Sequence, residues 1–208
     1  DTFGVASVLD VLLKWLKDSA NRHELFSNRG NQYEGVKITR YVNFYEVAGH
    51  EHPIVEIQTQ EERSHVFMTI IDRPPTGEFG LVNLARQFTI AKYAKRAYYA
   101  GVVFPMIHLE EKRKLEWILK MWTENASAGN LPAVIIDAQQ MNRLRMNEEG
   151  VRAQSAVHMA IRTLGSGPPE PYTFDRPFLL WIERDGVTEP LYVAWLDHDA
   201  WKDPGGLE

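Results

Sequence analysis

The sequence predicts an α+β domain in which antiparallel β-sheet dominates. Three β-rich stretches, 36–47, 53–58 and 65–72, follow one another with only short polar breaks, and this closeness favours antiparallel pairing. Near the end of the chain, two apolar stretches flank Asp185-Gly186, a dipeptide that suits the positive backbone angles of a hairpin turn. Apolar residues at helical spacing in other segments supply the α component.

The first segment of the chain predicts a helix that ends near Lys17. Its apolar residues recur at i, i+3 and i+4 and form one stripe: Val5, Val8, Leu9, Leu12, Leu13 and Leu16. The polar stretch 28–35 is marked by glycine and predicts a loop between this helix and the first strand.

The middle of the chain alternates between helical and strand patterns. Pro74-Pro75 ends the first β block, and 78–100 predicts a helix built around four apolar residues: Leu81, Leu84, Ala85 and Phe88. The strand 102–107 contains Pro105, which favours a sheet edge or a bulge there. Helical spacing returns over 115–122.

Strand patterns close the chain. Segments 133–136 and 144–146 are strand-like. The two hairpin arms, 178–182 and 191–196, are apolar on both faces, so they are expected to lie buried inside a stack of sheets.

Composition narrows the class of protein. With 208 residues, 44% apolar and 25% charged, the chain suits one domain or a large part of one. The net charge of −5 and the scattered basic residues do not indicate nucleic-acid binding, and no apolar run reaches the roughly 18 residues of a membrane span. Cysteine is absent, which excludes disulfides and thiolate nucleophiles. The sequon at Asn125 predicts a glycosylated, secreted protein, with a cytoplasmic location as the alternative.

The segment 147–172 carries two acids and a glycine near its start, at 148–150, and is rich in glycine and proline near its end, over 165–171. As a strand it would place small or apolar side chains on one face: Val151, Ala153, Ser155, Val157 and Met159. The other face would be mostly polar: Arg152, Gln154, Ala156 and His158. Its Gly- and Pro-rich flank instead predicts an exposed loop. The residues leave both interpretations open.

Several motifs, in order, resemble the serpin family. Asn147-Glu148-Glu149-Gly150, the small residues after it, the stretch 175–182 and the closing hairpin resemble the C-terminal signature of serpins. Stretches 53–57 and 66–74 resemble paired strands of the serpin B-sheet. The stretch 102–105, with the helix expected after it, resembles the strand and the helix that precede the fifth strand of the serpin A-sheet. The resemblance runs over about 36–200. It implies that 1–208 is the C-terminal part of one serpin-like domain, with a helix and loop over 1–35, a hinge and reactive-centre-type loop over 147–176, and a strand hairpin over 177–200.

The resemblance implies a metastable inhibitor of a protease, and of a serine protease in particular. In that family the target cuts an exposed loop, and the freed end inserts into a sheet and carries the acylated protease with it. The implied hinge positions are Glu148, Glu149, Gly150, Val151, Ala153, Ser155 and Val157. The implied scissile region is Arg162, Thr163, Leu164, Gly165 and Ser166, in which Leu164 suits a chymotrypsin-like pocket and Arg162 a trypsin-like one.

The sequence also departs from the serpin pattern. Arg143 and Arg145 share one face of a strand that is usually apolar, so they need partners if that face is buried. The N-terminal half of a serpin is not present in this sequence, and three explanations stay open: it is a second chain that acts as a partner, it was lost by proteolysis, or it was lost in evolution. These departures keep a second class open, a non-inhibitory binding protein such as a carrier, a chaperone or an immune-modulating ligand.

An enzyme is not expected. His50-Glu51-His52 is the densest histidine cluster, but it lacks the helical spacing that directs two imidazoles at one metal ion. No phosphate-binding glycine loop and no Gly-x-Ser-x-Gly motif occur in the sequence. No metal or other cofactor, no nucleic acid and no membrane is therefore expected as a partner.

Overall fold

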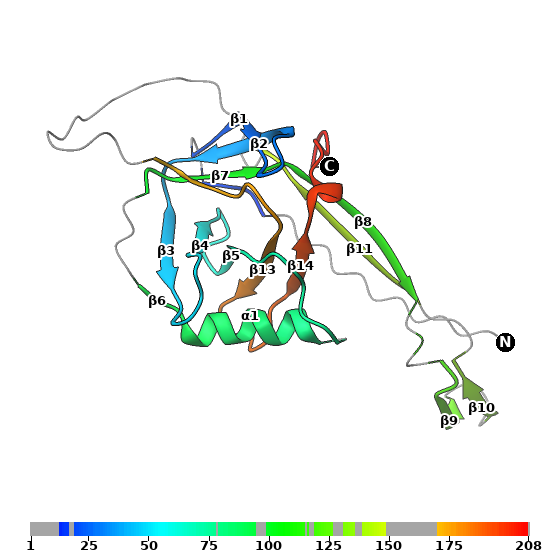
Figure 1. Ribbon diagram of the computed structural model, residues 1–208. Coiled ribbons are helices and arrows are strands. Elements are labelled where there is room, and N and C mark those ends of the chain that lie inside the picture. Colours follow the sequence, from blue (N-terminus) through cyan, green and yellow to red (C-terminus); the bar gives the residue numbers. More distant parts are fainter. Residues whose placement is uncertain are drawn as a thin grey trace, which may run out of the picture.

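The structure is a computed structural model that describes residues 13–16, 19–77, 79–94, 99–114, 116, 119–126, 131–135, 139–148 and 170–207. It contains a six-stranded sheet with a helix on its outer face, a four-stranded sheet, and a long two-stranded ribbon that extends away from both (Figure 1). The α+β class with mainly antiparallel sheets is confirmed.

The six-stranded sheet has the order β14-β13-β5-β4-β3-β6. Its strands are β3 Val42–Glu46, β4 Ile54–Gln58, β5 Ser64–Ile70, β6 Tyr93–Ala94, β13 Phe178–Arg184 and β14 Tyr192–Leu196. All of its pairings are antiparallel, as the sequence predicted. The hairpin β13–β14 is also confirmed, and Gly186 has the positive φ of 83° that the turn requires.

The four-stranded sheet has the order β1-β2-β7-β12. Its strands are β1 Ala20–Phe26, β2 Gln32–Ile38, β7 Val102–Pro105 and β12 Tyr172–Thr173. The loop expected over 28–35 is therefore too long, because β2 begins at Gln32 and pairs with β1. The β-rich stretch 36–47 is confirmed and covers the end of β2 and all of β3, which are separated at Tyr41, at φ 62°.

Pro105 does not mark a sheet edge. β7 lies between β2 and β12, and Pro105 is its last residue, opposite Gly35 of β2. β12 pairs only with Val102 and Val103, so the missing N–H of the proline interrupts no bond to that neighbour. The buried Met106 follows, and the chain continues as the next strand.

The two sheets enclose the main core. One face of the six-stranded sheet contributes buried residues such as Val55, Met68 and Leu180, and the four-stranded sheet contributes Ile38 and Phe104. The other face packs against the helix α1, Gly80–Ala91, in a second cluster: Ile54, Phe67, Ala85, Phe88, Leu179 and Trp181. The apolar strands are thus covered on both faces, as expected.

The helix α1 is shorter than the predicted 78–100. It ends at Ala91, because Tyr93 and Ala94 pair with β3 as the edge strand β6. At Tyr93 and Ala94 the backbone therefore pairs with the edge of the sheet and does not continue the helix.

The long ribbon consists of β8 Ile107–Lys114 and β11 Gln139–Met146, which are antiparallel, and it carries the hairpin of β9 Trp122–Ala126 and β10 Leu131–Val134 at its far end (Figure 1). Of the helix expected over 115–122, only Glu116 is helical among the described residues, in a 3-10 conformation, because Leu119 and Lys120 form a turn and Trp122 begins β9. Cross-strand pairing overrides the helical spacing there. The strand-like segment 144–146 lies in β11. Of the segment 133–136, Ala133 and Val134 lie in β10, Ile135 follows the end of that strand, and Ile136 lies outside the described residues.

The N-terminal helix is wrong at its predicted end. Residues 13–16 are not helical, and Trp15 forms an isolated antiparallel bridge with Thr59. The backbone carbonyl of Lys14 accepts a hydrogen bond from Gln60, so this segment bonds outward instead of within a helix. Residues 1–12, which carry most of the predicted stripe, lie outside the described residues. Within the described part of the chain, no helix has the length and hydropathy that crossing a membrane requires.

Candidate functional site

The candidate site is the point where β11 ends and the expected hinge begins. Of the predicted hinge residues the structure describes only Glu148. The others lie outside the described residues, as does the whole predicted scissile region: Glu149, Gly150, Val151, Ala153, Ser155 and Val157, then Arg162, Thr163, Leu164, Gly165 and Ser166. The residues 146–148 are called the β11 exit below.

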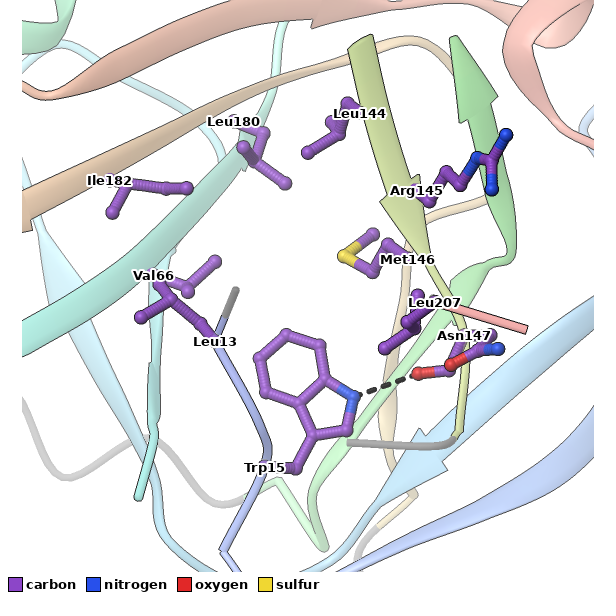
Figure 2. Close-up of a pocket in the computed structure, with 10 residues that line it drawn as sticks. All are labelled: Leu13, Trp15, Val66, Leu144, Arg145, Met146, Asn147, Leu180, Ile182 and Leu207. Atoms are coloured by element: carbon purple, nitrogen blue, oxygen red, sulfur yellow. Dashed lines mark hydrogen bonds between the residues drawn. The ribbon is translucent and has the colours of Figure 1, made fainter. Parts of the chain in front are cut away.

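The ends of the described chain meet at the β11 exit. The indole N–H of Trp15 donates a buried hydrogen bond to the carbonyl oxygen of Asn147 at 2.8 Å (Figure 2). The side-chain amide of Asn147 donates in turn to the carbonyl oxygen of Gly205 at 2.7 Å. Asn147 is almost fully buried, so water cannot bond its polar groups, and these two hydrogen bonds supply partners for them instead.

An ion-pair network lies beside these hydrogen bonds. Arg22 of β1 bonds Glu148 through Nε, and its Nη1 lies 3.2 Å from Oδ2 of Asp203. The hydrogen bond that Arg22 donates to Glu148, together with the nearby charges of Glu148, Asp203 and Glu34, raises the pKa of Arg22 despite its slight burial. Three segments far apart in sequence, 22, 148 and 203, are therefore joined around one guanidinium.

A small apolar pocket lies beneath the β11 exit. Figure 2 shows its lining from four directions: Leu13 and Trp15 of the N-terminal segment, Val66, Leu180 and Ile182 of the six-stranded sheet, Leu144, Arg145, Met146 and Asn147 at the end of β11, and Leu207 near the C-terminus. The space between these atoms, including its open mouth, is about 430 Å³. The inward side of β11 thus faces apolar side chains.

The opposite face of the ribbon is charged and open to solvent. Arg143 and Arg145 are 61% and 36% exposed, and both approach the carboxylate of Glu110 on β8, at 3.6 and 3.7 Å. Because the face is open, these arginines need no buried partner, and the pairs contribute little to stability. β11 bonds β8 along one edge, and no other strand pairs with it among the described residues. Asn125 lies in β9, at the far end of the ribbon.

The histidines of the 50–52 cluster form hydrogen bonds with other residues of the fold. His50 Nε2 lies 2.8 Å from the hydroxyl of Thr69, and His52 Nδ1 lies 3.0 Å from the hydroxyl of Tyr172. Burial, with the neighbouring His52, lowers the pKa of His50. Among the described residues, no group of three His, Asp or Glu side chains could hold a metal ion.

A second polar cluster lies on the outer face of the six-stranded sheet. The carboxylate of Glu56 is nearly buried and accepts hydrogen bonds from Asn43 at 3.0 Å and Tyr45 at 2.5 Å. Nδ1 of His65 lies 2.8 Å from it. Burial alone would raise the pKa of Glu56, but the bonds from Tyr45 and Asn43 and the charge of His65 outweigh it, so the pKa lies below its usual range. Every donor comes from the sheet itself, which indicates a structural group.

Sequence reasoning missed most of the β11 exit. Trp15 and Arg22 were part of a predicted helix and its following loop, and the segment after Ala200 had no predicted role. Pro204-Gly205-Gly206 after Asp203 was the only local signal, since it indicates a turn. Which distant segment such a turn contacts is not encoded in its local pattern.

Comparison with known proteins supports the fold alone. No protein-family model matches the sequence, and no curated protein matches it either. Among solved structures, Serpin48 of the insect Tenebrio molitor matches with a TM-score of 0.54 and 16% identity over 89% of this chain and 53% of its own. Mouse protein-Z dependent protease inhibitor matches with a TM-score of 0.56 and 15% identity over 89% and 52%.

A third match is thyroxine-binding globulin in complex with thyroxine, with a TM-score of 0.54 and 10% identity over 89% of this chain and 53% of its own. The chain thus spans about half the length of each serpin structure that it matches. The element order agrees with the resemblance in the sequence, in which the ribbon strand β11 directly precedes the hinge and the β13–β14 hairpin closes the fold. The chain therefore has a serpin-like fold, and its element order is consistent with the C-terminal segment of that fold.

Proposed function

We propose that this chain is the C-terminal part of a serpin-type inhibitor of a protease, in which the cut loop adds to β11 as a new strand. The observation that carries the proposal is the topology of β11. One of its edges is bonded to β8, no other strand bonds it within the described ranges, and it ends where the expected loop starts. A strand edge to which no other strand is bonded is a template for an added strand.

The register of such an addition agrees with the side-chain pattern. If the chain turns back with a loop of two or four residues within 147–150, Val151 lies opposite Met146 and Ala153 lies opposite Leu144. Directly opposite residues in antiparallel strands point to the same face. Met146 is buried and Leu144 half-buried, and both line the apolar pocket. The small, uncharged positions 151, 153, 155 and 157 would therefore face inward, and Gly150 would ease the turn.

The partners follow from this mechanism. The target is a protease, of the serine class in our proposal, that cuts within 162–166. The chain spans about half of the matched structures, so the rest of the fold is proposed to come from another segment or a second chain that completes the sheet. The chain itself performs no catalytic step. Secretion and glycosylation at Asn125 stay predictions of the sequence.

One observation favours the second class, a non-inhibitory binding protein. In the same register Arg152 lies opposite the exposed Arg145, and like charges directly opposite destabilise a strand pair. One matched structure is thyroxine-binding globulin in complex with thyroxine. A chain whose loop is cut but does not insert would belong to this class.

Limited proteolysis followed by thermal unfolding separates the two functions. The intact chain is treated with trypsin-like and chymotrypsin-like proteases, the cut is located by mass, and Tm is measured before and after. Insertion of a strand worth several kcal/mol predicts a rise in Tm of about 10 °C or more, at ~2–4 °C per kcal/mol. A cut within 162–166 with an unchanged Tm would rule out insertion and leave the binding function. A complex with the protease that survives SDS would establish inhibition directly.

A further inference from the structure

We propose that the C-terminal tail, residues 202–207, is a latch that holds the β11 exit in place and must be released before the loop can turn back onto β11. The contacts that form the latch are observed in the structure and do not depend on the proposed function. Its effect on the loop rests on the proposed function.

The tail has a defined conformation. Trp201, the residue just before the tail, is buried and forms an isolated bridge with Ile107 of β8. Further along, Gly205 has a positive φ of 68°, and its N–H donates to Oδ1 of Asp203 at 2.8 Å. Asp203 therefore uses one carboxylate oxygen to fix the turn of the tail and the other to pair with Arg22.

The tail reaches the β11 exit at three places. The carbonyl oxygen of Gly205 accepts from the side chain of Asn147, and Asp203 shares Arg22 with Glu148. The side chain of Leu207 lines the apolar pocket together with Met146 (Figure 2). A hydrogen bond to Asn147 and an ion pair that is shared with Glu148 through Arg22 thus link the tail to the two residues that follow β11, and Leu207 lines the same pocket as Met146.

These contacts oppose the movement that strand addition requires. A reversal of the chain within 147–150 changes the backbone direction at Asn147 and Glu148, whose side chains are held by Gly205 and Arg22. Val151, opposite Met146, would also point into the pocket that Leu207 lines. The tail and the returning loop therefore compete for the same place beside Met146.

The first test is hydrogen exchange of the uncut chain. Asp203→Asn keeps the acceptor for the Gly205 N–H and removes the charge that faces Arg22. Removal of residues 203–208 abolishes all three contacts. Asp199→Asn is the matched control, because Asp199 is an exposed acid just upstream of the tail and forms none of the contacts with the β11 exit.

We expect Asp203→Asn to speed exchange of the amides of 145–148 about two- to fivefold, the size of an exposed ion pair, and the truncation to speed it about tenfold or more. Asp199→Asn should leave it unchanged. Exchange that is the same in all four proteins would overturn the latch. If the truncated chain loses its near-ultraviolet circular dichroism, it is unfolded. The exchange rates of Asp203→Asn, compared with wild type and Asp199→Asn, then decide whether the latch exists.

The second test links the latch to the loop. In wild-type chain cut within 162–166, the rise in Tm is followed over time, and Asp203→Asn should reach it sooner than wild type and Asp199→Asn. Equal rates would overturn the role of the tail in insertion. If the cut wild type shows no rise at all, the proposed function fails, and hydrogen exchange of the uncut chain still decides whether the tail restrains the β11 exit.

Discussion

The six-stranded sheet and the β8–β11 ribbon have the same secondary structure but opposite exposure. The sheet is covered on one face by α1 and on the other by the main core, and residues such as Leu179 and Leu180 on β13 are almost fully buried on both faces. The ribbon has a charged open face, and β11 bonds only β8 among the described residues. The sheet is therefore the region in which we expect most of the stability to lie, and the ribbon is the region to which our proposal adds a new strand.

The largest expected effect lies in the sheet. Trp181 is fully buried, stacks on Phe67 with ring centroids 5.3 Å apart, and donates its N–H to Glu183 at 2.8 Å. Trp181→Ala should lower the free energy of unfolding by about 3–5 kcal/mol, because it leaves a large cavity and unpaired polar groups. Leu144→Ala in the ribbon should cost only about 1–2 kcal/mol, since Leu144 is half-buried. Urea unfolding measures both, and equal losses would erase the distinction between the two regions.

A glycine at the junction between the sheets gives the next largest effect. Gly101 has φ 121°, and a Cβ built on it would lie 2.2 Å from the carbonyl oxygen of Ile38. Gly101→Ala should therefore destabilise the chain by more than about 2 kcal/mol. Gly30 also has a positive φ, of 79°, but its Cβ would meet nothing within 4 Å, so Gly30→Ala should cost only about 1 kcal/mol. Thermal unfolding of Gly101→Ala and Gly30→Ala separates two costs of an added Cβ: the steric clash with a nearby backbone and the strain of a positive φ.

The Glu56 cluster predicts acid sensitivity of the sheet. The pKa of Glu56 is lower in the folded chain than in the unfolded chain, so its contribution is present above about pH 4.3 and is lost as the pH falls through the folded pKa. Glu56→Gln should destabilise the chain at pH 7 by about 1–3 kcal/mol, and by less at pH 3. Urea unfolding at the two pH values is the measurement. A loss that is equal at both would show that the charge of Glu56 is not what its partners stabilise.

The smallest expected effect concerns the ribbon and the loop. In the proposed register Arg152 faces Arg145, which already shares Glu110 with Arg143. Arg152→Glu should favour strand addition by about 0.2–1 kcal/mol and speed the rise in Tm after cleavage by up to about fivefold. Arg152→Gln should give an intermediate rate. A slower rise in Arg152→Glu would indicate a register shifted by one residue, with position 152 facing inward.

The sheet could be predicted from the sequence because its signals are local. The stretches around Ile54, Met68 and Leu180 are short and apolar, and Asp185-Gly186 marks the hairpin between β13 and β14. The pattern around Phe88 also located α1, although its end was placed too late because the edge pairing of Tyr93 is a tertiary contact.

The ribbon and the β11 exit could not be predicted in the same way. The spacing of Leu119 and Trp122 suits a helix, yet the chain pairs across strands there, and periodicity alone cannot decide between the two. Trp15, Arg22 and Asp203 meet only because the segments near the two ends of the chain fold back to β11. The hydrogen bond from Trp15 to Asn147 and the ion pair of Arg22 with Glu148 each join residues that are more than 120 positions apart in the sequence. Side-chain contacts of this range leave no local pattern.

The central claim is that the segment after Gly150 can become a strand of the ribbon. Hydrogen exchange of the chain cut within 162–166 tests it most directly, with the amides of 151–158 and of β11 as the readout. The account predicts that both sets gain protection after the cut, because the new strand and the open edge of β11 bond each other. If 151–158 exchange at the rate of an unfolded peptide and β11 is unchanged, the loop does not insert and the claim is wrong.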